Sequence, residues 1–121
     1  MVRSFMREML ARDTMTTIGM NEAEFNQAAA KTLAHIEQAL EGADLDFETP
    51  ADGIIEVEFE DGSKIIINRH GVAREIWVAA RSGGFHFKQQ AGDWVDTKDG
   101  TPLYDKLVAL IAAQGGGTAR F

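Results

Sequence analysis

In two segments between positions 44 and 60 the sequence alternates apolar and acidic side chains with a period of two residues. Residues 44–48 read Asp-Leu-Asp-Phe-Glu, and residues 55–60 read Ile-Glu-Val-Glu-Phe-Glu. Successive side chains of a β-strand point to opposite faces of its sheet, so each segment predicts a strand with one buried face and one acidic face. The sheet is therefore expected to be covered on one side and to meet water on the other.

Short turns join these strands to one another and to further strands. Residues 49–53 form a turn sequence, and Asp61-Gly62 is a strong hairpin signal. Four more strands are expected, over residues 63–69, 73–81 and 83–87 and around Trp94-Val95. Because turns this short connect antiparallel neighbours, the sequence predicts one antiparallel sheet of about six strands.

A helical pattern precedes the strands. Asn21 is followed three positions later by Glu24, which is a capping-box arrangement. It predicts a helix over residues 22–41 that ends at Gly42. The apolar stripe of this helix consists of Phe25, Ala29, Leu33, Ile36 and Leu40.

A second helical pattern follows the strands. We expect Thr101 as its N-cap, Pro102 as its first residue and glycines 115–117 as its end. Its apolar stripe consists of Leu103, Leu107, Leu110 and Ile111. Since each helix has one apolar stripe, both should pack on the same face of the sheet, which gives an α+β fold with two layers. The domain then spans residues 20–115, and residues 116–121 form a C-terminal tail that we expect to be loosely packed.

Residues 1–19 differ from the rest of the chain. They contain Arg3, Arg7 and Arg12 but lack the continuous apolar region that a secretory signal needs. Met20 lies directly before the predicted helix start. We expect an N-terminal extension outside the fold, and an amphipathic organelle transit peptide is the alternative.

Acidic residues are concentrated in the first half of the predicted domain. Residues 20–61 contain twelve Asp and Glu against the single base Lys31, a net −11, whereas residues 62–121 contain eight Lys and Arg against five acids, a net +3. Such crowding causes self-repulsion, so we expect a cation or a basic partner there. With a net charge of −7, the chain is expected to bind neither nucleic acid nor an anionic membrane. No apolar run approaches the roughly 20 residues that span a bilayer.

The residue types limit the chemistry of any site. The chain has no cysteine, which excludes thiolate ligands and a thiol nucleophile. Carboxylates are hard ligands for hard cations, but EF-hand, His-Glu-x-x-His, phosphate-loop and catalytic-triad signatures are all missing. The three histidines are scattered along the sequence and are interpreted as ordinary surface or edge residues. The acids predict a weak, shared metal site, a docking surface for a basic protein, or simply a solvated polar face.

Trp77 is the single residue most typical of a contact surface. Alternation with the apolar Ile76 and Val78 places it on the water-facing side of the sheet, where an exposed tryptophan is a candidate hot spot. Asn68 and Arg69 end the preceding strand and should lie near Trp77, giving a polar and aromatic patch. The alternative is that Trp77 packs under a neighbouring long side chain.

Three short motifs and one tryptophan are more specific than any of these patterns. They are Gly-Ser-Lys-Ile-Ile-Ile-Asn-Arg at 62–69, Ile-Trp-Val-Ala-Ala at 76–80, Gly-Gly-Phe-His-Phe at 83–87, and Trp94. Together they resemble the frataxin family, and most closely its bacterial branch. The similarity extends over the whole predicted domain.

This resemblance implies a helix–sheet–helix sandwich that binds ferrous and ferric iron weakly and reversibly. Family members hold iron on an acidic ridge formed by the first helix and the first strand. By position, that ridge corresponds here to Glu22, Glu37, Glu41, Asp44 and Asp46, with Glu24, Glu48 and Glu56 as outer candidates.

The resemblance also implies partners. Frataxins associate with the cysteine desulfurase and the scaffold protein of iron–sulfur cluster assembly, as iron-responsive regulators or iron donors. The partner-binding residues would be Asn68, Arg69 and Trp77. Some members are credited with slow iron oxidation, but we expect a binding protein rather than an enzyme. We expect a monomer that iron can drive into oligomers, in the bacterial cytoplasm or, for a eukaryotic source, in the mitochondrion. The alternative is an acidic protein-interaction module that acts on the desulfurase while iron binding is incidental.

Overall fold

The computed structural model describes residues 20–121, so the expected extension over residues 1–19 lies outside the described part. The elements are α2 (Glu22–Gly42), β1 (Asp46–Glu48), β2 (Ile54–Glu58), β3 (Lys64–His70), β4 (Glu75–Ala80), β5 (Gly83–Gln90), β6 (Asp93–Asp96) and α3 (Leu103–Ala113). The strands form one six-stranded sheet in chain order, and each neighbouring pair is antiparallel. The predicted α+β sandwich is confirmed.

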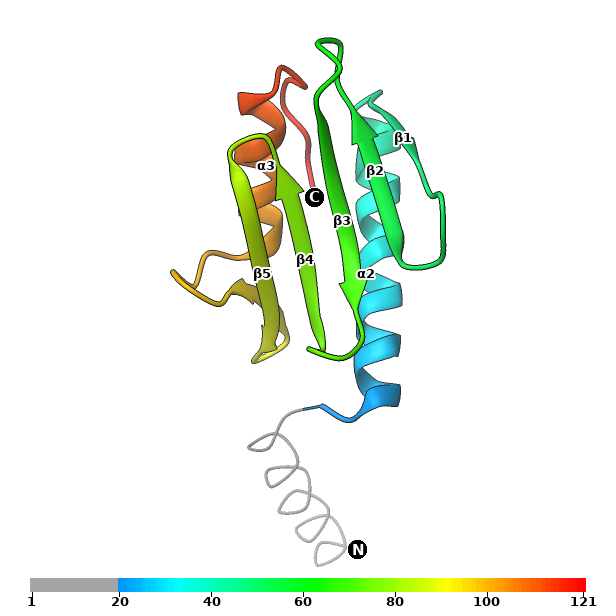
Figure 1. Ribbon diagram of the computed structural model, residues 1–121, viewed down its shortest axis with the longest axis vertical. Coiled ribbons are helices and arrows are strands. Elements are labelled where there is room, and N and C mark those ends of the chain that lie inside the picture. The colour runs from blue at the N-terminus through cyan, green and yellow to red at the C-terminus, as the bar shows by residue number, and fades with distance from the viewer. Residues whose placement is uncertain (1–19) are drawn as a thin grey trace, which may run out of the picture.

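Both helices cover the same face of the sheet (Figure 1). The core between the two layers includes Phe25, Ile36 and Leu40 of α2, Leu107 and Ile111 of α3, and Ile55, Ile65, Ile67, Ile76, Val78 and Phe87 of the sheet. The alternate strand positions point away from the helices, to a side that we call the open face. Neither helix of residues 20–121 is both long and apolar enough to cross a membrane.

The ends of the helices differ slightly from the prediction. The capping box of α2 is present, since the Glu24 N–H donates to Asn21 Oδ1 at 2.8 Å and the Asn21 N–H donates to Glu24 Oε1 at 3.0 Å. The N-cap of α3 is Pro102 rather than Thr101, and it has no side-chain cap bond. The reason is that Pro102 is extended and bridges to Val95 of β6, so the helix can begin only after it.

The C-terminal tail is packed rather than loose, which corrects our expectation for residues 116–121. Ala119 is buried, and the Phe121 ring stacks on Tyr104 with 5.5 Å between ring centroids. The Phe121 carbonyl oxygen lies 2.7 Å from His35 Nε2 of α2. A Cβ on Gly116 would lie 2.6 Å from Ile111 Cγ2. Glycine therefore lets the chain pass close over α3 at this point.

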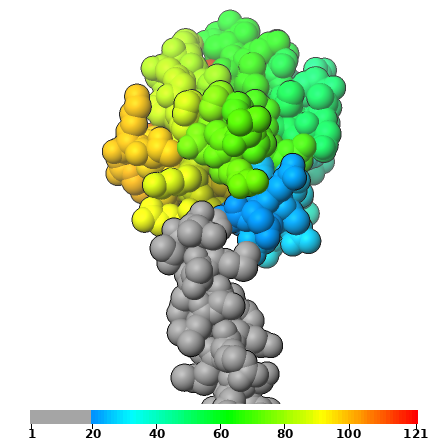
Figure 2. Space-filling view, turned by 60° about the horizontal axis from the view of Figure 1, so that its bottom comes forward, coloured from blue at the N-terminus to red at the C-terminus, as the bar shows by residue number. Residues whose placement is uncertain are grey.

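One end of the molecule gathers three segments that are distant in the sequence. The start of α2, the turn between β3 and β4 and the turn between β5 and β6 lie side by side there (Figures 1 and 2). The Arg74 guanidinium donates to the Met20 carbonyl at 3.3 Å, which joins two of these segments. The β3–β4 turn is thereby tied to the segment that leads into α2.

Candidate functional site

The acids of α2 occupy its two ends rather than a single site. Glu22 and Glu41 are separated by nearly the whole helix, about 28 Å at 1.5 Å per residue. Glu22 and Glu24 lie in the first turn, where a carboxylate complements the positive end of the helix dipole. Glu24 also accepts the capping-box bond, so it has a structural role in addition to the one proposed from sequence.

Glu37, Glu41 and Asp44 gather at the opposite end of α2, and we call them the helix-end carboxylates. Glu41 follows Glu37 by four residues, so the two lie on neighbouring turns of one helix face. Asp44 turns the chain toward β1 with a left-handed φ of 58°, and its N–H donates to the Glu41 carbonyl at 3.0 Å. The last turn of α2 contains no basic residue. This cluster therefore adds negative charge to the negative end of the helix dipole.

The acids of β1 and β2 form a second group, on the open face. Asp46 lies directly opposite Glu58, and Glu48 directly opposite Glu56. Sequence reasoning did not include Glu58 among the candidates, although pairing the two predicted strands across their turn would have found it. Like charges directly opposite each other destabilise a strand pair, so each of these pairs needs compensation.

Lys64 of β3 supplies part of that compensation. It lies opposite Glu58, and its Nζ donates to Glu56 Oε1 at 2.8 Å. That hydrogen bond, together with the charges of Glu56, Glu58 and Glu48, raises the pKa of Lys64. Within residues 20–121, no three Asp, Glu or His side chains converge closely enough to hold a metal ion. The carboxylates instead form an exposed belt.

The predicted patch of Asn68, Arg69 and Trp77 is divided between the two faces of the sheet. Asn68 lies directly opposite Trp77 on the open face. Arg69 lies opposite the buried Ile76, because consecutive strand residues point to opposite faces. Its guanidinium contacts Asp52 Oδ2 at 3.0 Å. The grouping of Arg69 with Trp77 was therefore wrong.

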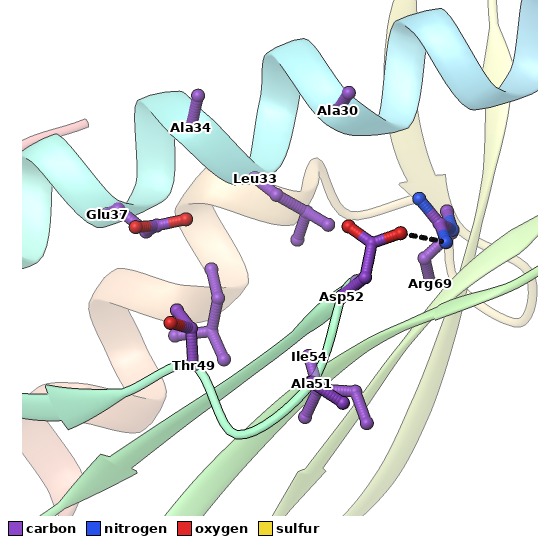
Figure 3. A pocket seen from close by; sticks show the side chains of 11 residues that line it. Ala30, Leu33, Ala34, Glu37, Thr49, Ala51, Asp52, Ile54 and Arg69 are labelled. Carbon is purple, nitrogen blue, oxygen red and sulfur yellow. Dashed lines mark hydrogen bonds and ion pairs between the residues drawn. The ribbon is translucent and has the colours of Figure 1, made fainter.

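Arg69 instead lines a cavity of about 360 Å³ between α2 and the β1–β2 loop. Leu33 and Glu37 of α2 form one side of this cavity, and Asp52 faces Arg69 on the other (Figure 3). Gly53, with a φ of 81°, leaves room for Arg69, because a Cβ there would lie 3.1 Å from Arg69 Cζ. Glu37 thus links the helix-end carboxylates to the rim of this cavity.

Trp77 is half-buried between two histidines, an arrangement that we call the His–Trp–His stack. Its ring lies 3.7 Å from the His70 ring and 4.2 Å from the His86 ring, and the planes are nearly parallel, at 13° and 6°. Its Nε1 donates to Glu75 Oε1 at 2.8 Å. Both histidines lie at the surface, as expected, but their joint stacking on Trp77 was not predicted. Strand pairing was the missing signal, since His86 lies directly opposite Trp77.

Comparisons with known proteins agree with this geometry. The family model for the frataxin-like domain matches residues 18–117. An iron-sulfur cluster assembly protein CyaY from Dechloromonas aromatica is 52% identical over 99 residues, which cover 80% of this chain and 94% of the relative. A CyaY from Cupriavidus taiwanensis is 43% identical and covers 84% of this chain and 96% of the relative.

Two solved structures share the fold. Frataxin from Psychromonas ingrahamii superposes with a TM-score of 0.76 at 33% identity, covering 83% of this chain and 96% of the other. Trimeric yeast frataxin complexed with ferrous iron superposes with a TM-score of 0.65 at 26% identity, covering 72% and 84% respectively. The sandwich, the motifs and these relatives together show that the chain belongs to the frataxin family, in its CyaY branch.

Proposed function

We propose that this protein binds ferrous and ferric iron weakly and acts in iron–sulfur cluster assembly, where it regulates the machinery or supplies iron to it. Two findings about relatives support this. The bacterial relatives are named iron-sulfur cluster assembly proteins, and one solved frataxin carries ferrous iron. The bacterial relatives also support a place in the bacterial cytoplasm.

The observation that carries the iron proposal is the charge at the end of α2. Glu41 and Asp44 lie at the negative end of the α2 dipole, Glu37 lies one turn before them, and no base lies in the last turn. A bound cation would offset the unfavourable interaction of these carboxylates with the helix dipole, worth about 0.3–1 kcal/mol per charge at a surface. It would also offset the repulsion between Glu37 and Glu41, worth about 0.2–0.5 kcal/mol. Carboxylate oxygens are hard ligands, which match ferric iron well and the borderline ferrous ion less well. Because the carboxylates do not converge on one point, the site should be weak and should leave most of the coordination shell to water.

The partners we propose are the cysteine desulfurase and the scaffold protein. The open face offers them Asn68 and Trp77 as directly opposed residues, and a half-buried tryptophan on an uncovered sheet face is typical of an interface hot spot. Arg69 would act at a different place, on the rim of the cavity under α2. We propose a binding role without turnover, so that slow iron oxidation, where it occurs, is secondary.

A second candidate is an acidic docking module for which iron is incidental. It is favoured by the paired acids of β1 and β2, which spread over an exposed surface as a basic partner would require. Association driven by such charges weakens as salt screens them. Binding to the desulfurase that does not change between low and high salt would count against this candidate.

An anaerobic ferrous titration of the full chain, followed by amide NMR, tests the iron proposal. We expect selective paramagnetic broadening at the helix-end carboxylates and Asp46. The Glu37→Gln/Glu41→Gln variant should lose most of it, since it removes two of the ligands. The matched control is Asp93→Asn/Asp105→Asn, which removes the same charge from exposed acids outside the candidate ridge and should keep the broadening on α2. Broadening that survives in the first variant, or disappears equally in both, would contradict the assignment. Sizing with and without iron in the same samples tests the expected monomer and its iron-driven oligomers.

A further inference from the structure

We propose that the His–Trp–His stack makes the open face responsive to protons, so that acidification weakens the docking of a cationic partner surface. The inference rests on the proposed function in naming the desulfurase as the partner, but the uptake of protons by the stack can be tested without it. Nothing in the family comparisons assigns a role to this pair of histidines.

The geometry makes both histidines part of the same contact surface as Trp77. Both rings lie almost flat against the indole, one on each side. The indole therefore offers its edge to a partner, and the two imidazoles form the flanks of that edge. The His86 side chain is 49% exposed, so its ring can exchange protons with water and can touch a docked protein.

Protonation would change the contacts of His86 directly. Its Nδ1 lies 3.7 Å from Glu75 Oε1, so a protonated ring forms an ion pair with that carboxylate. The same ring would then be a cation against the face of Trp77, a favourable cation–π contact. Glu75 already accepts the Trp77 Nε1–H at 2.8 Å. A protonated His86 would therefore contact both the Glu75 carboxylate and the Trp77 indole, which are already hydrogen-bonded to each other.

Protonation of His70 would have a different effect. The Ala73 N–H donates to His70 Nδ1 at 3.2 Å, so in the neutral ring the proton sits on Nε2. A second proton on Nδ1 would leave two donors facing each other and would break this bond. It would thereby release the β3–β4 turn from the stack. The two histidines thus couple protons to the shape of the surface as well as to its charge.

The charged groups around the stack are few. Glu75 lies directly opposite His70, and Lys88 follows His86 on the same face of β5, opposite Val95 of β6. From the chain after β6, the contact to His86 is a backbone one, the Thr97 N–H to the His86 carbonyl at 2.9 Å. Arg74 in the β3–β4 turn directs its guanidinium to Met20 of the segment before α2. Because the charges of Glu75 and Lys88 cancel, uptake of two protons would give this patch a net charge of about +2.

The direction of the effect follows from the rest of the open face. Asp46, Glu48, Glu56 and Glu58 make that face acidic on β1 and β2, so the partner surface that fits it is cationic. Imidazoles gain their charge between pH 8 and pH 5. Each added positive charge repels a cationic partner. An interaction between two surface charges is worth about 0.2–1 kcal/mol, so each proton should weaken the affinity by about fivefold at most.

Tryptophan fluorescence of the full chain between pH 8 and pH 5 tests proton uptake by the stack. A protonated imidazole in contact with an indole quenches its emission, so emission should fall as the pH is lowered. The other tryptophan, Trp94, is buried and hydrogen-bonded to Thr32, so its emission should not change with pH. The Trp77→Phe variant measures this Trp94 emission alone. His70→Gln/His86→Gln should abolish the change. The matched control is His35→Gln, which removes the one other histidine of the chain and should keep it.

Affinity for the cysteine desulfurase at pH 8 and pH 6, at fixed ionic strength, tests the consequence. The natural chain should bind several-fold more weakly at pH 6 than at pH 8. The affinity of the double histidine variant should change less than twofold. Comparing the two proteins also corrects for titration of the desulfurase itself. Emission that is constant across the range, or an equal pH effect on affinity in both proteins, would overturn the inference. If the desulfurase binds at neither pH while emission still responds, the proposed partner is wrong and proton uptake by the stack stands.

Discussion

The contact between Thr32 of α2 and Trp94 of β6 gives a test in which hydrogen bonding and hydrophobic burial predict opposite results. The Trp94 Nε1–H donates to Thr32 Oγ1 at 2.8 Å, and both residues are buried. Trp94 also packs edge-on against Phe25, with 6.0 Å between ring centroids. This contact joins the helix that carries the candidate iron ligands to the far edge of the sheet.

The change to make is Thr32→Val, which keeps the shape of the side chain and removes the acceptor. Leaving a buried N–H unpaired costs about 1–3 kcal/mol. Replacing a hydroxyl by a methyl group returns at most about 0.8 kcal/mol of apolar burial. We therefore expect a net loss of about 0.2–2 kcal/mol if the full burial gain is realised. For a domain of this size, that lowers the melting temperature by about 4–8 °C per kcal/mol.

Urea unfolding followed by circular dichroism measures the effect, with an unchanged m-value as the sign that only stability has moved. Thr32→Ser is the matched control, because it keeps the acceptor and loses only one methyl group, at a cost of about 0.8 kcal/mol. The valine variant should be less stable than the natural protein, and the serine variant should lose no more than its missing methyl group accounts for. A valine variant as stable as the natural protein would refute this reasoning and would show that apolar burial dominates at this site.

Two further predictions concern packing and pH. Gly116→Ala should lower the free energy of unfolding by about 1–3 kcal/mol through overpacking, since its Cβ would lie 2.6 Å from an Ile111 methyl carbon. Gly71→Ala is the control, because its Cβ would meet nothing within 4 Å. It should change the stability measured in urea by less than about 0.5 kcal/mol. Burial raises the pKa of Tyr104, so the folded state holds this proton more tightly than the unfolded chain. The resulting stability is present below the unfolded value of about 10 and is lost as the pH rises through the folded one. Tyr104 is the one tyrosine of the chain, so tyrosinate absorbance in folded and urea-unfolded samples checks the shift directly, and coincident titrations would contradict it.

The sheet could be predicted because apolar and polar residues alternate along its strands and because its turns are short. Segment ends were less predictable, because they depend on single backbone conformations. Residues 44–48 alternate throughout, yet β1 begins only at Asp46, since Asp44 adopts a left-handed conformation to turn the chain. In the same way β4 begins at Glu75, after Arg74 with a φ of 56°.

The sequence supplies a set of candidate residues, but their arrangement in space could not be read from it. The acids could be found from the composition of residues 20–61. Whether Glu22 and Glu37 share a site depends on the length of α2, which places them at opposite ends of the helix. Arg69 shows an avoidable error, since its parity with the buried Ile67 already places it on the covered face. The His–Trp–His stack required the pairing of β4 with β5, and the packed tail required tertiary contacts of Gly116 that no local pattern contains.

The paired acids of β1 and β2 bear on why this fold keeps so much negative charge. Glu48 opposite Glu56, and Asp46 opposite Glu58, each oppose strand pairing, by roughly 0.2–1 kcal/mol relative to a neutral pair. Lys64 compensates at one place, with a single hydrogen bond to Glu56. Neutral polar residues at positions 46 and 48 would satisfy the open face without this cost. Folding therefore gives no reason for these acids, whereas binding to a cation or a basic surface does, because the repulsion that weakens the free protein is relieved in the complex. Each like-charged pair thus raises the gain in stability on binding, and the same residues that destabilise the edge of the sheet strengthen its attraction for the partner.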